Sequence, residues 1–316
     1  MKTAELRRFG AFVARNTKGY FKNKFNFFLS LITPLILLVL FVTFLRNVYI
    51  ESFRAAFPEG FAVDPRLLNG VVGAWLMSSI LSVSSVTVAF SSNIIMVEDK
   101  VNGCINDFRV APVRGTMISV GYFVSNFAVT LIVMLAVMLI GHIYLAAVGW
   151  YISVADTFMI IVDVVLGVLF GTLLAGVVES FISSQGGMSA VSVLVSSMYG
   201  FISGAYMPLS SFSSGLRSFI GLLPGTYGMN ILRNRYMSGY IDAMADAGLP
   251  AEAIDGIKTG FDMKLEVFGA DVSLGAAYGI LLGACAVLLA AYIAIVIIKN
   301  RRLHKKSGNG KARSAA

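Results

Sequence analysis

Charged side chains are scarce in this sequence, yet several crowd into one short stretch between two long apolar runs. The stretch from Val97 to Gly115 reads VEDKVNGCINDFRVAPVRG, and its charged residues are Glu98, Asp99, Lys100, Asp107, Arg109 and Arg114. Because acids and bases are mixed, the stretch suits the docking of another protein better than the binding of anionic lipid, which favours bases. A solvated connector, kept out of a membrane by its charges, is the alternative.

Residues for catalysis or nucleotide binding are harder to find. No G-x-x-x-x-G-K-[ST] phosphate loop occurs, so the chain has no visible means of binding ATP. His142 and His304 lack metal-ligand neighbours, and Cys104 and Cys285 have no evident partner for a disulfide or a metal. We therefore expect no catalytic residue, no metal and no cofactor on this chain.

Hydroxyl side chains recur at helical spacing in two apolar segments. One set is Ser78, Ser82, Ser85 and Ser92, and the other is Ser189, Ser192, Ser196, Tyr199 and Ser203. Small residues on one stripe favour close helix packing, but they also suit the wall of a transport path. A path walled by hydroxyls, Met and aromatic rings would fit an amphipathic or apolar substrate better than a bare ion.

Composition and charge-free gaps predict that these residues belong to an all-α membrane protein. Of the 316 residues, 57% are hydrophobic and only 13% are charged. Each charge-free gap exceeds the roughly 20 residues that a helix needs to cross the hydrocarbon core. The gaps lie between Arg66 and Glu98, Arg114 and Asp156, Glu179 and Arg217, and Asp271 and Lys299. Two more stretches, Phe27 to Leu45 and Thr157 to Val178, bring the expected number of spans to six.

The distribution of bases predicts the topology. Bases gather before the first span and after the last, so both chain ends are expected in the cytoplasm. The net charge of +8 then indicates contact with anionic membrane lipids and not with nucleic acid. Residues 1–25 have an apolar side with bases around it, which favours a helix lying in the cytoplasmic interface. Residues 300–316 form a basic cytoplasmic tail.

Several smaller elements follow from local patterns. Apolar residues at helical spacing predict a short amphipathic helix over residues 97–112, with the charged residues mostly on its other face and Pro112 at its end. Residues 208–271 contain apolar pieces around Phe219–Leu223 and Tyr227–Leu232 that are too short to cross and are broken by Pro224-Gly225. One or two short external helices are expected after them.

Isolated acids and repeated glycines mark two of the spans. Asp163 is the lone acid within a predicted span, where a functional role and simple snorkelling to the outer surface both remain open, and Glu179 at the inner end is explained by contact with cytosol. Glycines recur every four residues at Gly167 and Gly171 and at Gly275, Gly279 and Gly283, which permits close helix approach.

Two stretches resemble the permease subunits of type-2 ATP-binding-cassette exporters. The first is DKVNGCINDFRVAPVRG, with Gly103, Ala111-Pro112-Val113 and the later Gly121 where the family has its glycines and proline. The second is FISGAYMPLSSFSSGLRSFIGLLPGTYGMNILRN, which matches through Ser203, Gly204, Pro208, Pro224, Thr226, Tyr227 and Arg233. With the six-span layout, the resemblance covers nearly the whole chain.

The resemblance implies a division of roles within one transmembrane permease domain over residues 1–316. Spans one to five would occupy residues 26–207 and the sixth residues 272–299. The segment 97–112 would be a cytoplasmic coupling helix that contacts a nucleotide-binding ATPase subunit, which carries the ATP and Mg²⁺. The residues expected there are Glu98, Asp99, Gly103, Asp107, Arg109 and Pro112. Residues 208–271 would form an external re-entrant gate, with the residues Gly204, Pro208, Pro224, Thr226, Tyr227 and Arg233.

The family also implies where and how the chain would work. Ser78, Ser82, Ser85, Ser189, Ser192, Ser196, Tyr199 and Ser203 would line a path between two permease chains, as a homodimer or with a paralogue. We expect export of an amphipathic, drug-like or lipid-linked compound across the cell membrane of a prokaryote. An ion-gradient-driven secondary transporter, with Asp163 as its candidate acid, is the alternative.

Overall fold

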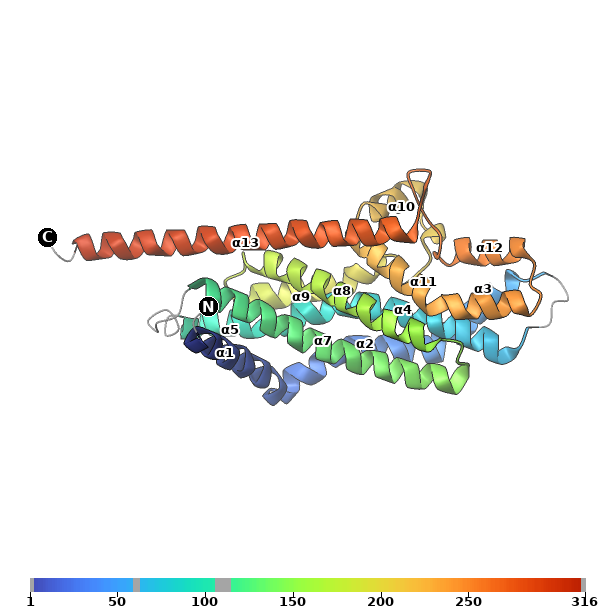
Figure 1. The fold of residues 1–316 in the computed structure, drawn as a ribbon, viewed down its shortest axis with the longest axis horizontal. Helices are drawn as coiled ribbons and strands as arrows, with labels where there is room; N and C mark the ends of the chain where they lie inside the picture. The colour runs from blue at the N-terminus through green and yellow to red at the C-terminus, as the bar shows by residue number, and fades with distance from the viewer. Residues whose placement is uncertain (1–2, 59–62, 106–114, 314–316) are drawn as a thin grey trace.

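The protein is almost entirely helical, as its computed structural model shows for residues 3–58, 63–105 and 115–313 (Figure 1). In chain order the elements are α1 (Thr3–Lys22), α2 (Lys24–Leu40), a π-helical turn η1 (Phe41–Leu45), α3 (Arg46–Ala55), α4 (Pro65–Ser92), α5 (Ile94–Val101), α7 (Gly115–Val148), α8 (Val154–Glu179), α9 (Gln185–Ile202), a 3-10 turn η2 (Leu209–Ser211), α10 (Ser214–Gly221), α11 (Pro224–Asp246), α12 (Ala251–Gly260), β1 (Leu265–Val267), β2 (Ala270–Val272) and α13 (Leu274–Arg313). The strands β1 and β2 form an antiparallel hairpin in which Glu266 faces Asp271.

Four helical segments of the described chain are long and apolar enough to cross a membrane. They are Pro65–Val101, Gly115–Val148, Val154–Glu179 and Leu274–Arg301. A fifth is added if Ser30–Phe44 and Arg46–Ala55, which are bent by 59°, form one span. The bend falls at η1, and a π-helical turn is a known cause of such kinks. The predicted number of six is therefore not confirmed. The missing one is α9, whose 18 residues give a helix only about 27 Å long.

Helix α4 forms the centre of the bundle. It is buried on all sides, and it contacts α2, α3, α7, α8, α9 and α11. Asp64 caps its start by accepting a hydrogen bond from the backbone N–H of Arg66, and Pro65 occupies the first turn, where a missing N–H costs nothing. Asn93 interrupts the helix at its other end, and the chain continues as α5. Helix α4 thus lies between the other helices of the bundle and contacts most of them.

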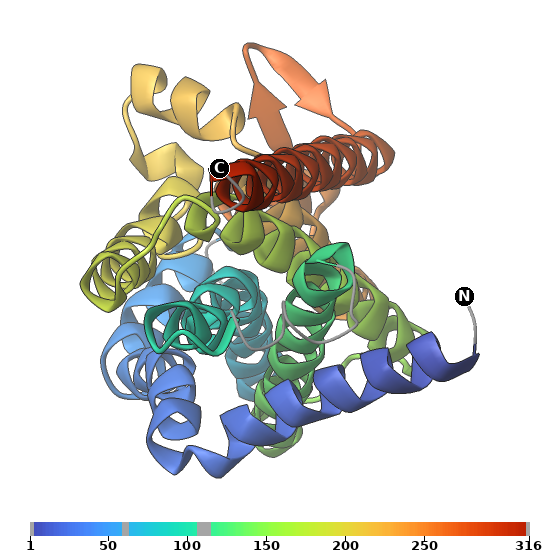
Figure 2. The ribbon, with the colours of Figure 1, turned by 90° about the vertical axis from the view of Figure 1, so that its left-hand side faces the viewer.

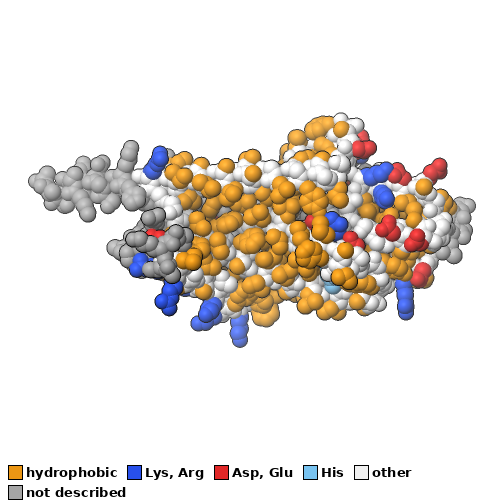
Figure 3. Space-filling model, in the orientation of Figure 1, with side chains coloured by type: hydrophobic (Ala, Val, Ile, Leu, Met, Phe, Trp, Pro, Cys, Tyr) orange, Lys and Arg blue, Asp and Glu red, His pale blue; other side chains and the backbone are white. Residues whose placement is uncertain are grey.

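The two ends of the bundle differ in what they carry. Both chain termini lie at one end, named here the terminal end, where α1 runs across the axis of the bundle and packs on α7 (Figures 1 and 2). The opposite end carries α3 and α12. Basic side chains gather along α1 at the terminal end, and acidic ones gather toward the opposite end (Figure 3).

The predicted break at Pro224-Gly225 is present, but the pieces around it differ from the expectation. Helix α10 ends at Gly221, and Pro224 begins α11. The second piece is not short, because α11 continues for 23 residues to Asp246 and packs on α4, α8 and α13. The rest of this segment is α12 and the hairpin of β1 and β2. We call residues 208–272 the cap.

The two glycine series lie in different surroundings. A methyl group at Gly171 would lie 2.4 Å from the carbonyl oxygen of Ser85, and one at Gly167 would lie 3.3 Å from the Ser85 hydroxyl. These glycines let α8 approach the backbone of α4, as predicted. Gly275, Gly279 and Gly283 of α13 have no described atom within 4 Å of such a methyl group. That series serves no close approach among the described residues.

The Gly171→Ala substitution should destabilise the protein, because the new methyl group would clash with the backbone of Ser85. Unlike a side chain, the backbone cannot relieve the clash by changing rotamer. Overpacking of this kind costs about 1–3 kcal/mol. Thermal unfolding followed by size-exclusion chromatography in detergent would show an earlier loss of the folded peak. Gly279→Ala is the matched control and should unfold no earlier than the unsubstituted protein. Equal losses from both substitutions would contradict the close approach of α8 to α4.

Candidate functional site

Asp99 of the charged stretch points into the protein and not toward solvent. Its carboxylate accepts hydrogen bonds from Arg15 of α1, at 2.6 and 3.1 Å, and from the Tyr122 hydroxyl of α7, at 2.6 Å. Only 6% of Asp99 is exposed, whereas Val101, expected on the apolar face, is 50% exposed. The predicted assignment of faces is wrong at both positions, because partners from α1 and α7 satisfy the buried carboxylate.

Hydrogen bonding to Asp99 raises the pKa of the Arg15 guanidinium, and burial opposes this rise. Three elements that are distant in sequence thus meet at one carboxylate. In the sequence, Arg15 is one of many bases before the first predicted span. No sequence pattern marks Tyr122 as a partner of Asp99. Both become visible only when α1 is seen to lie against α7.

Glu179 at the end of α8 also differs from its prediction. It is fully buried, and it accepts a hydrogen bond from the side chain of Asn93, the residue that separates α4 from α5. Contact with cytosol therefore does not explain it. The Lys100 ammonium nearby donates to the carbonyl oxygen of Ile182, at 3.5 Å, in the connection from α8 to α9. Helix α5 is thus tied to α1, α7 and the end of α8.

The rest of the predicted coupling segment is described only in part. Glu98 is half-buried, and Gly103 has a φ of 78°, the left-handed conformation that commonly ends a helix. Asp107, Arg109 and Pro112 lie outside the described residues. Their assignment to a coupling surface stays a prediction.

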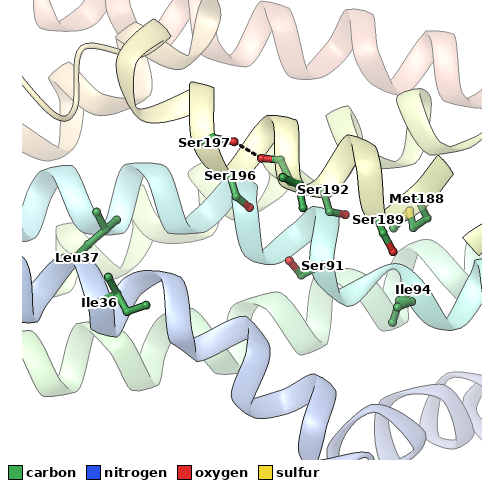
Figure 4. A pocket seen from close by; sticks show the side chains of 10 residues that line it. Ile36, Leu37, Ser91, Ile94, Met188, Ser189, Ser192, Ser196 and Ser197 are labelled. Atoms are coloured by element: carbon green, nitrogen blue, oxygen red, sulfur yellow. Dashed lines mark hydrogen bonds between the residues drawn. The ribbon is translucent and has the colours of Figure 1, made fainter. Parts of the chain in front are cut away.

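A cavity of about 530 Å³ lies between α2, α4 and α9. Ser189, Ser192 and Ser196 of α9 face it together with Ser91 of α4 (Figure 4). Ser197 and apolar residues complete the lining, among them Ile36, Leu37, Ile94, Met188 and Val193. Hydroxyls and apolar groups that line one cavity make a surface that suits an amphipathic molecule.

The serines predicted on α4 do not reach this cavity. Ser78, Ser82 and Ser85 are buried within the bundle, and Ser78 and Ser85 donate hydrogen bonds to the carbonyl oxygens of Trp75 and Ser82. These serines serve helix packing, which is the alternative to lining a transport path. Ser91, one residue before the predicted Ser92, supplies the hydroxyl instead. Ser203 is buried as well, with 1% exposed.

Tyr199 faces a different space on the other side of α9. A second cavity of about 620 Å³ is lined by apolar residues of α4, α8, α9 and α13 and by Leu223, Pro224 and Gly225 at the start of α11. A methyl group at Gly225 would lie 2.3 Å from the Tyr199 hydroxyl oxygen. The turn between α10 and α11 therefore reaches inward against α9.

The predicted gate residues lie in and beside the cap. Thr226 and Tyr227 donate hydrogen bonds of 2.7 Å to the carbonyl oxygens of Ile220 and Gly221, which fixes the turn at Pro224. Gly204 has a φ of 72° where the chain leaves α9, and Pro208 precedes η2. These residues shape the connection from α9 to α11.

Arg233, like Thr226, is a predicted gate residue that is fully buried. Its guanidinium donates to Asp262 at 2.8 Å and to the Ser79 hydroxyl at 2.9 Å, and it lies 4.7 Å from the centre of the Trp75 ring. Asp262 also accepts two bonds from the backbone N–H of Leu209, at 2.9 and 3.1 Å. The ion pair thus lies within the cap, and the guanidinium joins the cap to α4 through Ser79 and Trp75.

Burial raises the pKa of Asp262 to about 6, although the charge of Arg233 opposes the rise. The carboxylate is therefore still ionised at neutral pH and can balance the guanidinium. Sequence reasoning missed Asp262, since nothing in the acidic segment around it distinguishes this acid from its neighbours.

Asp163 is not free. Its carboxylate accepts a hydrogen bond of 2.5 Å from the Tyr278 hydroxyl and lies 3.5 Å from the Arg235 guanidinium. With 3% exposed it does not snorkel to a surface. The described residues contain no group of three or more His, Cys, Asp or Glu that could hold a metal ion.

The Asp262→Asn substitution should destabilise the protein strongly, because it leaves the buried guanidinium of Arg233 without a counter-charge. Breaking a buried pair in this way costs about 3–5 kcal/mol. Chemical unfolding of the purified chain measures the loss. Asp255→Asn is the matched control, because the Asp255–Lys264 pair is exposed and should contribute at most about 1 kcal/mol. An equally small loss at Asp262 would contradict the role of the pair.

Cysteine substitution distinguishes serines that line a water-accessible cavity from serines that are packed inside the bundle. In a chain without Cys104 and Cys285, Ser192→Cys and Ser196→Cys should react with a charged thiol reagent at least about tenfold faster than Ser78→Cys, because only exposed thiolates react. Ile293→Cys in α13 is a second control, since 49% of Ile293 is exposed but it lines neither cavity, and it should react as slowly as Ser78→Cys. Equal labelling at Ser78 and Ser192 would contradict the assignment of the cavity.

Comparison with known proteins agrees with this arrangement. The sequence profile of the ABC-2 type transporter family matches residues 7–237, which include the helices around the hydroxyl-lined cavity and most of α11. No curated protein compared with the chain matches it. The profile covers well over half of the sequence, and the chain therefore belongs to the ABC-2 type transporter family, whose members are membrane permeases of ABC transporters.

Proposed function

We propose that this chain is the permease subunit of an ATP-driven exporter that moves an amphipathic, drug-like or lipid-linked compound out of the cell. The observation that carries the proposal is the cavity between α2, α4 and α9, which is lined by hydroxyls of α4 and α9 and by apolar side chains of α2, α5 and α9. A substrate with one polar and one apolar part satisfies both kinds of lining group. A bare ion would need rings of charge or carbonyl oxygens.

The energy would come from a separate nucleotide-binding subunit that carries ATP and Mg²⁺. Its docking surface on this chain would be the segment 97–112, to which Asp107 and Arg109 contribute charges of both signs. A force on α5 would reach α1 and α7 through Asp99 and the end of α8 through Asn93 and Glu179. The cap, with its turn at Pro224, would open on the other side.

Two permease chains would form the complete path. Ser189 and Ser197 line the cavity but are exposed, so the wall contributed by one chain leaves the cavity open. A second copy or a paralogue would close it. The bases at the terminal end favour a cytoplasmic position for both chain ends, in contact with anionic lipids of a prokaryotic cell membrane.

The ion-gradient alternative finds little support at Asp163. The neighbouring Arg235 and Tyr278 neutralise and hydrogen-bond this carboxylate, so it is not poised to exchange a cation. Transport that persists after ATP depletion, with the ion gradient intact, would favour that alternative over an ATP-driven exporter.

Reversing both charges in Asp107→Lys with Arg109→Glu should separate the permease from its ATPase subunit. Like charges facing each other at an interface cost several kcal/mol, so we expect affinity to fall by about a hundredfold or more. Native mass spectrometry of the complex gently purified from its own membrane, with an ATPase assay, measures this loss. Asp246→Lys, exposed at the end of α11, is the matched control and should keep the complex intact. A permease that arrives without any ATPase, yet still transports, would overturn the proposal.

A further inference from the structure

A small polar cavity lies where α1 and α7 meet the break between α4 and α5. It leaves about 10 Å³ open to a water molecule, and it shares no lining residue with the two larger cavities. Its polar lining residues are each at most 5% exposed, and they are Asn16 of α1, Ser92 and Asn93 at the break, and Tyr122, Ser125 and Asn126 of α7. Such a concentration of buried polar groups requires hydrogen-bond partners for all of them.

Asn16 brings an unused hydrogen-bond donor to this small cavity. The Arg15 guanidinium donates to Oδ1 of Asn16 at 2.8 Å, which fixes the orientation of the amide. The Nδ2 group of the same amide is buried and has no partner among the described residues. Because a buried donor without a partner is costly, Asn16 calls for an acceptor in the space beside it.

Two hydroxyls that line the small cavity offer only lone pairs. The Ser125 hydroxyl donates its hydrogen to the carbonyl oxygen of Gly121 at 2.7 Å, and the Tyr122 hydroxyl donates to Asp99 at 2.6 Å. Since a hydroxyl has a single hydrogen, each of these oxygens can still accept a bond but cannot give one. The ligand that suits the cavity therefore accepts from an amide and donates to hydroxyl oxygens.

We propose that this cavity binds one ordered water molecule, which accepts a hydrogen bond from Nδ2 of Asn16 and donates to the hydroxyl oxygens of Ser125 and Tyr122. The space is close to the about 10–15 Å³ that one water needs, and three bonds are the usual number for a buried water. A metal cation does not fit, because Asn16 presents an N–H group and the described lining residues include no carboxylate. An apolar group would leave the amide without a partner.

The water joins α1 to α7 beside the residue at which α4 gives way to α5. The direct bonds from Arg15 and Tyr122 to Asp99 already link these helices, and the water adds a link of another kind. A water-mediated bond is nearly as good as a direct one, and the water can turn to keep its bonds when its partners shift. Helix α5 can therefore move against α1 and α7 without leaving the Asn16 amide unpaired. This site does not depend on the transported compound or on ATP.

The test is radiolytic hydroxyl labelling of the purified full chain, read by mass spectrometry. A bound water delivers hydroxyl radicals to the side chain beside it, so Tyr122 should be labelled at least about tenfold faster than Tyr49. Tyr49 is the matched control, because it is 8% exposed against 4% for Tyr122 and lines none of the cavities described above. Asn16→Leu removes the donor and should lower the labelling of Tyr122 to the rate of Tyr49. Thr17→Val should leave it unchanged, since the Thr17 hydroxyl is also buried without a described partner but does not line the cavity.

The contrary results are equally specific. Equal labelling of Tyr122 and Tyr49 in the unsubstituted chain would show that the cavity is dry and overturn the site, and this comparison needs no variant. Fast labelling of Tyr122 that survives Asn16→Leu would show that the amide does not hold the water. An equal loss of labelling from Asn16→Leu and Thr17→Val would assign the effect to the packing of α1 and not to the donor of Asn16. Each variant must elute as a folded species in size-exclusion chromatography.

Discussion

The all-round burial of α4 is the constraint on which the rest of the structure depends. In a membrane no difference in solvation drives one apolar helix onto another, so association rests on close packing and hydrogen bonds. Helix α4 meets this requirement with small side chains whose hydroxyls bond to carbonyl oxygens of their own helix, as Ser78 does with Trp75. Its polar atoms are thereby satisfied without water. At Gly171 the backbone of α8 can come into direct contact with it.

Buried carboxylates mark the places where other elements join this centre. Asp99 and Glu179 lie beside the break between α4 and α5, and Asp262 and Asp163 lie at the opposite end. Each has a partner from a different helix. Buried ion pairs contribute little net stability once desolvation is counted, but removing one partner is costly. We infer that these four acids fix which helices meet, and that apolar packing supplies most of the stability.

Much of the fold could be predicted from the sequence, because the limits of apolar runs follow directly from the charges that interrupt them. The spans 65–101, 115–148, 154–179 and 274–301 each overlap one of the apolar stretches that composition defines, although three of them extend past the charges at its limits. The break at Pro224 was equally predictable, since proline is found more readily in the first turn of a helix than in its interior. Contacts between side chains that are distant in the sequence could not be predicted from it. The pattern around Val97 predicts an apolar face, but only Arg15, 84 residues away, decides that Asp99 is buried.

The candidate site, like the fold, could be predicted from the sequence only in part. Helical spacing identified the serines of α9 that face a cavity, because α9 has only one side covered by the bundle. It failed on α4, since a helix buried on all sides gives its serines no free face, and spacing carries no information about coverage. Among the predicted gate residues, Arg233 was found through the family pattern while its partner Asp262 was not. A buried ion pair has a sequence signal only when both members lie in recognisable segments.

Helix α9 is covered by the bundle on only part of its surface. It packs mainly on α4 and α5, and several of its apolar side chains are exposed, including Val193, Leu194 and Met198. Segments with few buried contacts open and shift at low cost in free energy. Its serines face the hydroxyl-lined cavity while Tyr199 faces the apolar one beside the turn at Pro224. Because α5 contacts α9 directly, the charged stretch is connected to both cavities through one helix.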